Sequence, residues 1–99
     1  MKKITSIVTD DTEHCYIHKK FLNIEVDAVH EHHMCHGTAN RRLADKDRLV
    51  CGLCEQCHRL LHDQNYHDID LLQDAEKAWI EHNNSSIESW IKRYGKNYL

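Results

Sequence analysis

The sequence predicts one domain of the α+β class, in which two short strands are followed by helices. The chain has 99 residues and a mass of 11.8 kDa, which suits one domain with a modest core. Apolar residues alternate with acidic ones over residues 24–28, as in a half-buried strand. In the last third of the chain, apolar residues recur every three or four positions, as in amphipathic helices.

Both strands are expected in the first half of the chain. Residues 4–9 could form a short strand or stay irregular, and residues 24–28 predict a strand that leads into His32-His33. Residues 36–47 are polar and contain a glycine, so we expect a loop between this strand and a second one over residues 49–53.

Three helices are expected after the second strand. A short one begins at Cys57 and turns its leucines inward. A second covers residues 68–83 with Asp68 as its N-cap, and a third covers residues 86–94, preceded by a Ser85-x-x-Glu88 capping box and ended by Gly95. The apolar positions of the last two helices are Ile69, Leu72, Ala75, Trp79, Ile80, Ile87, Trp90, Ile91 and Tyr94.

Five cysteines and ten histidines mark the composition. An odd number of cysteines fits a disulfide framework poorly, so metal ligands or free thiols are expected. The sequence has no apolar run long enough for a signal peptide or a membrane span and a mean hydropathy of −0.73, which predicts a cytosolic protein. The formal net charge of −3 argues against strong nonspecific binding to nucleic acid, although bound metals would change this charge.

Two short motifs have the spacing of metal ligands. A Cys54-x-x-Cys57 turn can place two thiolates on one zinc, and His58 and His62, four residues apart, lie on the same side of a helix. One metal could therefore be structural while a second, next to it, is catalytic. In a strand His32 and His33 would face opposite sides, so one can bind metal and the other meet substrate only if the backbone bends there.

Residues 15–62 resemble the HNH endonuclease family, which has a ββα-metal (His-Me finger) fold. The resemblance implies a zinc-stapled ββα-metal core over about residues 14–63, followed by the two C-terminal helices. The whole chain is similar to small HNH-type proteins of phages and prophages. The matching stretches are Cys15-Tyr16, His32-His33, Gly37-Thr38-Ala39-Asn40-Arg41 and Gly95-Lys96-Asn97-Tyr98-Leu99.

This resemblance assigns the catalytic histidines. It implies that His33 is the general base that takes a proton from water, a role that a neutral imidazole suits at pH 7. It implies that His32 and His58 bind one divalent ion, such as Mg²⁺, Mn²⁺, Ni²⁺ or Zn²⁺, with His62 as a third ligand or a phosphate contact. The alternative is that His32 and His33 are merely polar residues at a strand end.

The resemblance also implies a structural zinc ion held by Cys15, His18, Cys54 and Cys57. Many relatives have cysteine where this chain has His18, but three cysteines and one histidine are an ordinary zinc set. The alternatives are that His14 or Cys51 replaces a ligand, or that Cys54 and Cys57 are only small buried residues.

The asparagine that orients the base in the HNH family is replaced here by Asp47-Arg48, just before the second strand. Asn40 or Asp47 could take its place, or either could cap a turn of its own backbone. The basic residues near the histidines suggest phosphate contacts, for which we assign Arg41, Arg42 and Arg59; the alternative is a solvated basic loop. We expect the remaining aromatic and cysteine side chains to pack in the core: Trp79, Trp90, Tyr94, Tyr98, Cys35 and Cys51. The alternative for the four aromatic rings is stacking on nucleic-acid bases.

The function expected from these observations is metal-dependent hydrolysis of DNA phosphodiester bonds by a phage or prophage protein in the bacterial cytoplasm. Such a small enzyme would either dimerise to reach both strands or cut one strand only. The main alternative is an inactive HNH-derived protein that binds nucleic acid or a protein partner, for instance as a phage-encoded inhibitor. A purely structural zinc finger is a third option, which leaves His32, His33 and His62 unexplained.

Overall fold

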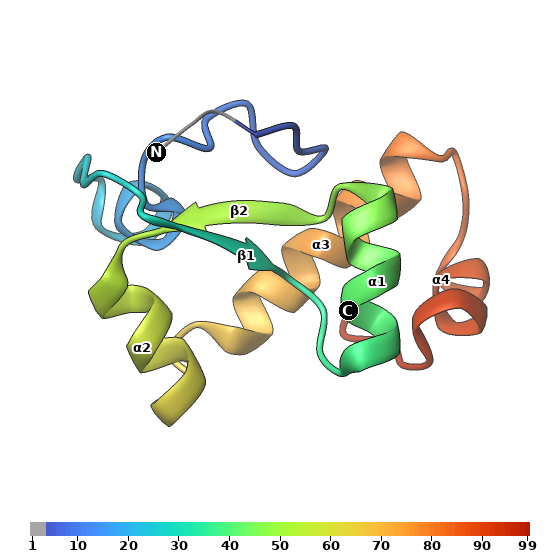
Figure 1. Cartoon of the computed structure of the whole chain (residues 1–99). Helices are drawn as coiled ribbons and strands as arrows, with labels where there is room; N and C mark the ends of the chain where they lie inside the picture. Colours follow the sequence, from blue (N-terminus) through green and yellow to red (C-terminus); the bar gives the residue numbers. More distant parts are fainter. Residues whose placement is uncertain (1–3) are drawn as a thin grey trace.

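A two-stranded antiparallel sheet lies at the centre of the computed structural model, which describes residues 4–99. Strand β1 (His30–His33) pairs with β2 (Val50–Leu53), so that His30 faces Leu53 and His33 faces Val50. Helix α1 connects the two strands and α2 follows β2. Helix α3 runs behind the sheet, and α4 packs against α3 on the side of α1 (Figure 1). The predicted α+β class is confirmed.

The segment between the strands is a helix, so the predicted loop over residues 36–47 is wrong. Helix α1 (Thr38–Asp47) begins after Gly37, whose φ is 87°, and ends at Arg48 in the left-handed conformation. Its buried strip is narrow: Ala44 has no exposed surface, whereas most other side chains are polar and exposed. A helix held by so few apolar positions looks like a loop in the sequence, because the hydrophobic period is nearly absent.

Strand β1 is shorter than predicted and begins after the alternating stretch. Residues 24–28 pair with the N-terminal segment instead of with β2, through an isolated bridge between His14 and Asp27. The Cys15 amide donates to the Val26 carbonyl at 2.6 Å, and this contact holds the first cysteine beside the sheet. Residues 4–9 form no strand, and β2 lies within the predicted range of 49–53.

The helices after β2 occur close to where they are predicted. Helix α2 (Glu55–Gln64) begins two residues before Cys57, because the Cys54 sulfur caps it by accepting from the Cys57 amide. Its Leu61 is buried, and Leu60 is half-buried. No helix of residues 4–99 has the length and apolar character that a membrane span requires.

Helices α3 (Asp68–His82) and α4 (Ile87–Tyr94) match their predicted ranges, but their N-terminal caps differ from the predictions. His67, not Asp68, is the N-cap of α3. The Ser86 hydroxyl caps α4 by accepting from the Ser89 amide, in place of the predicted Ser85 capping box. Gly95 ends α4 in the left-handed conformation with a φ of 93°, as predicted.

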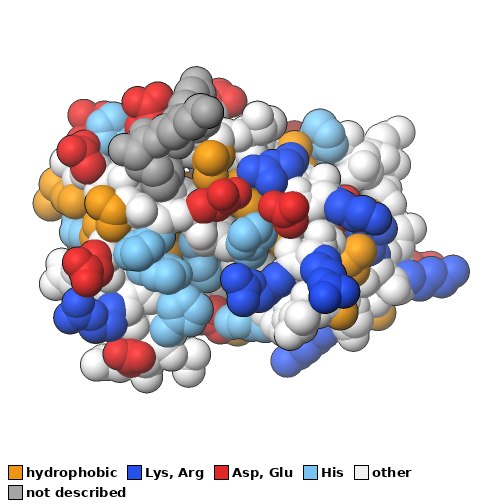
Figure 2. All heavy atoms as spheres, viewed as in Figure 1, with side chains coloured by type: hydrophobic (Ala, Val, Ile, Leu, Met, Phe, Trp, Pro, Cys, Tyr) orange, Lys and Arg blue, Asp and Glu red, His pale blue; other side chains and the backbone are white. Residues whose placement is uncertain are grey.

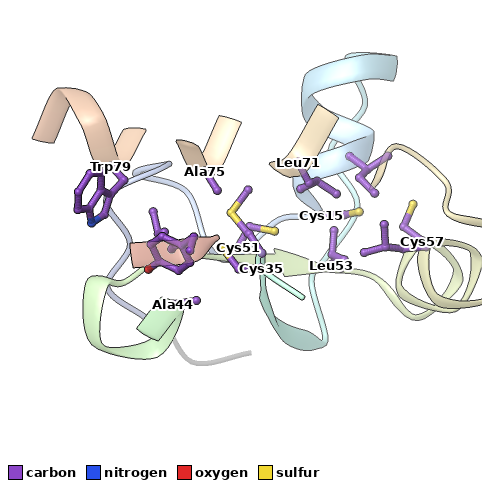
Figure 3. Packing of buried hydrophobic residues seen from close by; sticks show 14 of the residues in the cluster. Cys15, Cys35, Ala44, Cys51, Leu53, Cys57, Leu71, Ala75 and Trp79 are labelled. Atoms are coloured by element: carbon purple, nitrogen blue, oxygen red, sulfur yellow. The ribbon is translucent and has the colours of Figure 1, made fainter. Parts of the chain in front are cut away.

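The core contains most of the predicted aromatic residues. Trp79, Trp90 and Tyr94 are buried, and the rings of Trp90 and Tyr94 stack with centroids 4.1 Å apart. Cys35 and Cys51 are buried in the same cluster, as predicted for packing residues (Figure 3). Tyr98 is only half-buried. Three residues of the expected apolar stripes are instead exposed: Ile69, Ile87 and Ile91.

Gly52 lets the N-terminal segment pass directly over β2. A Cβ atom at this position would lie 2.4 Å from the Thr12 carbonyl oxygen and 2.7 Å from the Ala28 Cβ, closer than real atoms approach. This close passage brings the following residues, Cys15 and His18, toward the end of β2.

We therefore expect Gly52→Ala to destabilise the fold by about 1–3 kcal/mol, the usual cost of overpacking a core. The measurement is urea unfolding in saturating zinc. Gly37→Ala is the matched control, because nothing lies within 4 Å of a Cβ there and only the positive φ is strained, at about 1 kcal/mol. A smaller loss of stability for Gly52→Ala than for Gly37→Ala would contradict the packing argument.

Candidate metal centres

Three thiol sulfurs surround one imidazole nitrogen at the end of β2. His18 Nδ1 lies 3.3 Å from Cys15 Sγ, 3.6 Å from Cys54 Sγ and 3.3 Å from Cys57 Sγ. Zinc–sulfur and zinc–nitrogen bonds in a tetrahedral site place S and N about 3.5 Å apart. The four predicted ligands are therefore positioned to bind a metal ion, in an arrangement compatible with structural zinc.

Two separate segments build this Cys/His cluster. Cys15 and His18 come from the turn that opens the short π-helical segment His18–Leu22, and Cys54 and Cys57 come from the junction of β2 and α2. The Cys57 amide donates to Cys54 Sγ at 3.4 Å, a contact that stabilises a thiolate. Figure 3 shows Cys15 and Cys57 toward one end of the buried cluster, with Trp79 toward the other.

The Cys57 thiol is held in its protonated form when no metal is bound. Burial, reinforced by the neighbouring cysteines, raises the pKa of Cys57 far above its ordinary value. A zinc ion bound here would therefore displace the Cys57 proton, and acidification would release the ion.

The alternative ligands considered from the sequence lie elsewhere. His14 contacts Asp11, with Nδ1 2.8 Å from a carboxylate oxygen, and Cys51 is fully buried within β2. Burial raises the pKa of the Cys35 thiol to about 12, so it stays protonated at neutral pH. All five cysteines are free of disulfide bonds.

A second group consists of three imidazoles from β1 and α2. His58 and His62 lie one helical turn apart with their Nε2 atoms 3.1 Å from each other, and a ligand nitrogen of His32 lies within 4.8 Å of both. Two nitrogens on one tetrahedral zinc are about 3.3 Å apart. The arrangement thus has the spacing of a three-histidine metal site, which we call the His cluster.

The His cluster is electrostatically suited to a cation. Burial, with a contribution from His58 and His62, lowers the pKa of His32 to about 3. Burial likewise lowers the pKa of His58. Both rings are therefore expected to be neutral at pH 7, the form in which histidine binds metal. His30 stacks on His58 with ring centroids 4.5 Å apart and so limits the orientations of that ring.

His33 faces a different set of partners from His32. Its Nε2 lies 3.2 Å from Asp45 Oδ1 on α1. Both histidines nevertheless line one cleft of about 530 Å³, because β1 ends at His33 and the chain bends at once over residues 34–35. The cleft is lined by Glu31, His32, His33, Cys35, His36, Gly37, Arg41, His58, Leu61, His62 and Asn65.

Neither residue proposed to replace the family asparagine contacts His33. The Asn40 amide donates to the Tyr94 carbonyl, and the Asp47 carboxylate accepts from the Tyr94 hydroxyl and from Arg93. Asp45 contacts His33 instead. The sequence did not predict this pair, because Asp45 reaches His33 only when residues 38–47 form a helix.

Arg48 holds Asp45 in place. Its guanidinium lies 3.0 Å from Asp45 Oδ1 and 3.0 Å from Glu31 Oε2, and it also donates to the Thr5 carbonyl. The hydrogen bond from His33, with the charge of Arg48, lowers the pKa of Asp45. The carboxylate is therefore ionised at neutral pH. Glu31, His33 and Asp45 are close enough to hold a metal, but Arg48 already pairs with both carboxylates.

The three arginines assigned to phosphate differ in their positions. Arg41 and Arg42 are exposed on α1; Arg41 lines the cleft, and both line an adjoining hollow that also contains His33. Arg59 lies outside both and pairs with Glu55 one turn earlier on α2. Figure 2 shows the imidazoles gathered beside the basic side chains of the α1 region.

Comparisons with protein-family models, with curated proteins and with solved structures find no match for this chain.

We expect Cys57→Ser to lose one zinc equivalent per chain and to unfold the region around β2 and α2. Zinc binding contributes about 10–16 kcal/mol to folding in small zinc modules, so loss of one ligand should outweigh the stability of the domain. Metal analysis and thermal melting by circular dichroism measure the two effects. Cys35→Ala is the control and should keep its zinc, because Cys35 lies outside the Cys/His cluster. Full zinc content in Cys57→Ser would exclude the assigned ligand set.

Proposed function

We propose that this protein is a metal-dependent endonuclease of the HNH type that hydrolyses DNA phosphodiester bonds in the cytoplasm of a phage-infected or prophage-bearing bacterium. The observation that carries the proposal is the convergence of His32 from β1 with His58 and His62 from α2, while His33 lines the same cleft. The two strands and α2, which carry these histidines, are the elements that the HNH resemblance implies; in this chain α1 lies between the two strands.

Imidazole nitrogens suit the His cluster to a divalent cation such as Mg²⁺, Mn²⁺, Ni²⁺ or Zn²⁺, because a neutral imidazole ligand leaves the charge of the ion undiminished. Such an ion would supply positive charge against the scissile phosphate and its leaving oxygen. His32 and His58 are the principal ligands in this proposal, and His62 is the third.

His33 acts as the general base and removes a proton from the attacking water. The Asp45 carboxylate accepts a hydrogen bond from the Nε2–H group of His33. The lone pair of Nδ1 is then free to take the proton of the attacking water. Asp45 therefore selects the tautomer and fixes the ring, the role that the family asparagine would otherwise play. Arg41, which lines the cleft, contacts a phosphate oxygen of the bound strand.

The Cys/His cluster contributes stability rather than chemistry. Cys57 and His58 are neighbours on α2, so a zinc ion at Cys57 also fixes the position of the first helical turn that carries His58. In this way the structural metal orients the ligands of the catalytic one.

His33→Ala should abolish plasmid nicking in Mg²⁺, Mn²⁺ or Ni²⁺ while leaving zinc content and melting temperature unchanged. Loss of a general base typically costs about 10²–10⁴-fold in rate. His58→Ala should also be inactive and should lose the second metal. His82→Ala, an exposed histidine at the end of α3, is the control and should cut normally.

Full activity in His33→Ala would remove this mechanism. No nicking by the wild-type protein with any of these three ions, together with intact zinc, would favour the inactive HNH-derived alternative. Retained nicking in His58→Ala would point to a contaminating nuclease.

Asp45→Ala should lower kcat about 10-fold, with KM and metal content unchanged. This loss is smaller than the loss of about 10²–10⁴-fold expected when the base itself is removed. Asp45→Asn keeps an oxygen acceptor for His33 and should recover part of the lost rate. A rise in KM with kcat unchanged would show that Asp45 influences substrate binding instead. Single-turnover nicking assays at several substrate concentrations separate the two quantities.

A further inference from the structure

One face of α1 carries exposed basic side chains, and the other face is used for packing. Arg41, Arg42 and Lys46 are exposed. Arg41 and Arg42 are adjacent, Lys46 follows one turn later, and all three line one hollow with Thr38 on the same side of the helix. On the opposite side Ala44 is buried, while Asn40 and Asp47 bond to residues of α4. We call the exposed side, Thr38, Arg41, Arg42 and Lys46, the α1 basic face.

The positive charge of the α1 basic face is not neutralised by carboxylates. Among residues 4–99, Arg41, Arg42 and Lys46 form no salt bridge. The one acid on this side of the helix, Asp45, is already engaged by His33 and Arg48. The α1 basic face therefore has three positive side chains without salt-bridge partners within one ten-residue helix, although the net charge of the whole chain is −3.

This face is continuous with the cleft that holds the histidines. His33 and Arg41 line both the cleft and the hollow formed by Thr38, Arg42, Asp45 and Lys46. A helix of ten residues is about 15 Å long. A phosphate backbone that lies along α1 would therefore reach His33 with no change in the conformation of the protein. Figure 2 shows basic side chains over the α1 region next to the pale-blue imidazoles.

We propose that the α1 basic face is the docking surface for a nucleic-acid phosphate backbone and that it delivers duplex DNA to His33. This rests on the proposed function in its choice of DNA as the ligand, but it concerns binding, which is measured apart from cleavage. Arg59 is not part of this surface, because it lies on α2 and pairs with Glu55.

The chemistry of the surface fits phosphate better than it fits a protein partner. Arginine forks match phosphate oxygens, and the exposed hydroxyl of Thr38 adds a neutral donor. Protein interfaces have apolar cores, whereas none of the large exposed apolar side chains of the described chain lies on α1; they are Leu22, Ile24, Val29, Ile69, Ile87, Ile91 and Leu99.

The experiment measures binding of a fluorescent 20-base-pair duplex by anisotropy over a series of NaCl concentrations. The full zinc-loaded chain is used without any added divalent ion, so that the duplex stays intact. The variant is R41Q/R42Q/K46Q, because glutamine preserves helix propensity. The matched control is K77Q/K92Q/K96Q, which removes three exposed positive charges elsewhere and has the same net charge.

The slope of log K against log salt should become shallower by about 2.7 in the α1 variant, since each phosphate contact to duplex DNA contributes about 0.9. A single-stranded oligonucleotide should show a change of about 2, at about 0.7 per contact. The control variant should keep the wild-type slope. Arg42→Gln alone should change the slope by about 0.9, which gives a test that does not depend on the folding of the triple variant.

An unchanged slope in both α1 variants would overturn the proposal, because these residues would then make no phosphate contacts. An equal change of slope in the control would also overturn it, because the slope would then depend on the net charge of the protein and not on the position of the charges. Binding of an acidic polypeptide with no binding of duplex DNA would also overturn it and would assign the surface to another partner. Salt-dependent binding here, combined with no plasmid nicking when Mg²⁺, Mn²⁺ or Ni²⁺ is added, would refute the proposed nuclease and leave this docking surface intact.

Discussion

The meeting of two chain segments at the Cys/His cluster is the constraint on which the rest of the structure depends. A sheet of two four-residue strands is too small to be stable alone, and the segment before β1 is held mainly by isolated contacts. Zinc at this point would tie the N-terminal turn to the end of β2 and the start of α2. Because His58 directly follows Cys57, the same tie determines where α2 presents its imidazoles to β1.

The alternation of side chains along β1 divides the candidate site into two parts. His30 and His32 face α2, where they meet the imidazoles of that helix, and Glu31 and His33 face the side of Asp45 and Arg48. The bend directly after His33 then lets both parts line one cleft. A metal-binding role and a proton-accepting role can therefore occupy adjacent residues without competing for one position.

Helix α1 links the candidate site to the rest of the domain. Its inner side is held against α4 by Asn40 and Asp47, and its outer side supplies Asp45 to His33 and basic side chains to solvent. A flexible loop in this place would offer the same charges without fixing their distance from His33. In the proposed nuclease, the rigidity of the helix would allow one element to orient the base and also to guide the substrate.

The sequence by itself determined the features that depend on local geometry. The spacing of Cys54 and Cys57, and of His58 and His62, predicts shared ligation because a turn and a helix fix such distances within one segment, and the ranges of α3 and α4 follow from apolar periodicity. Only the tertiary structure decided that residues 38–47 form a helix, that residues 24–28 pair with residues 13–15, and that Asp45 is the partner of His33. These features depend on contacts between segments far apart in the chain, whose energies have no local signature in the sequence.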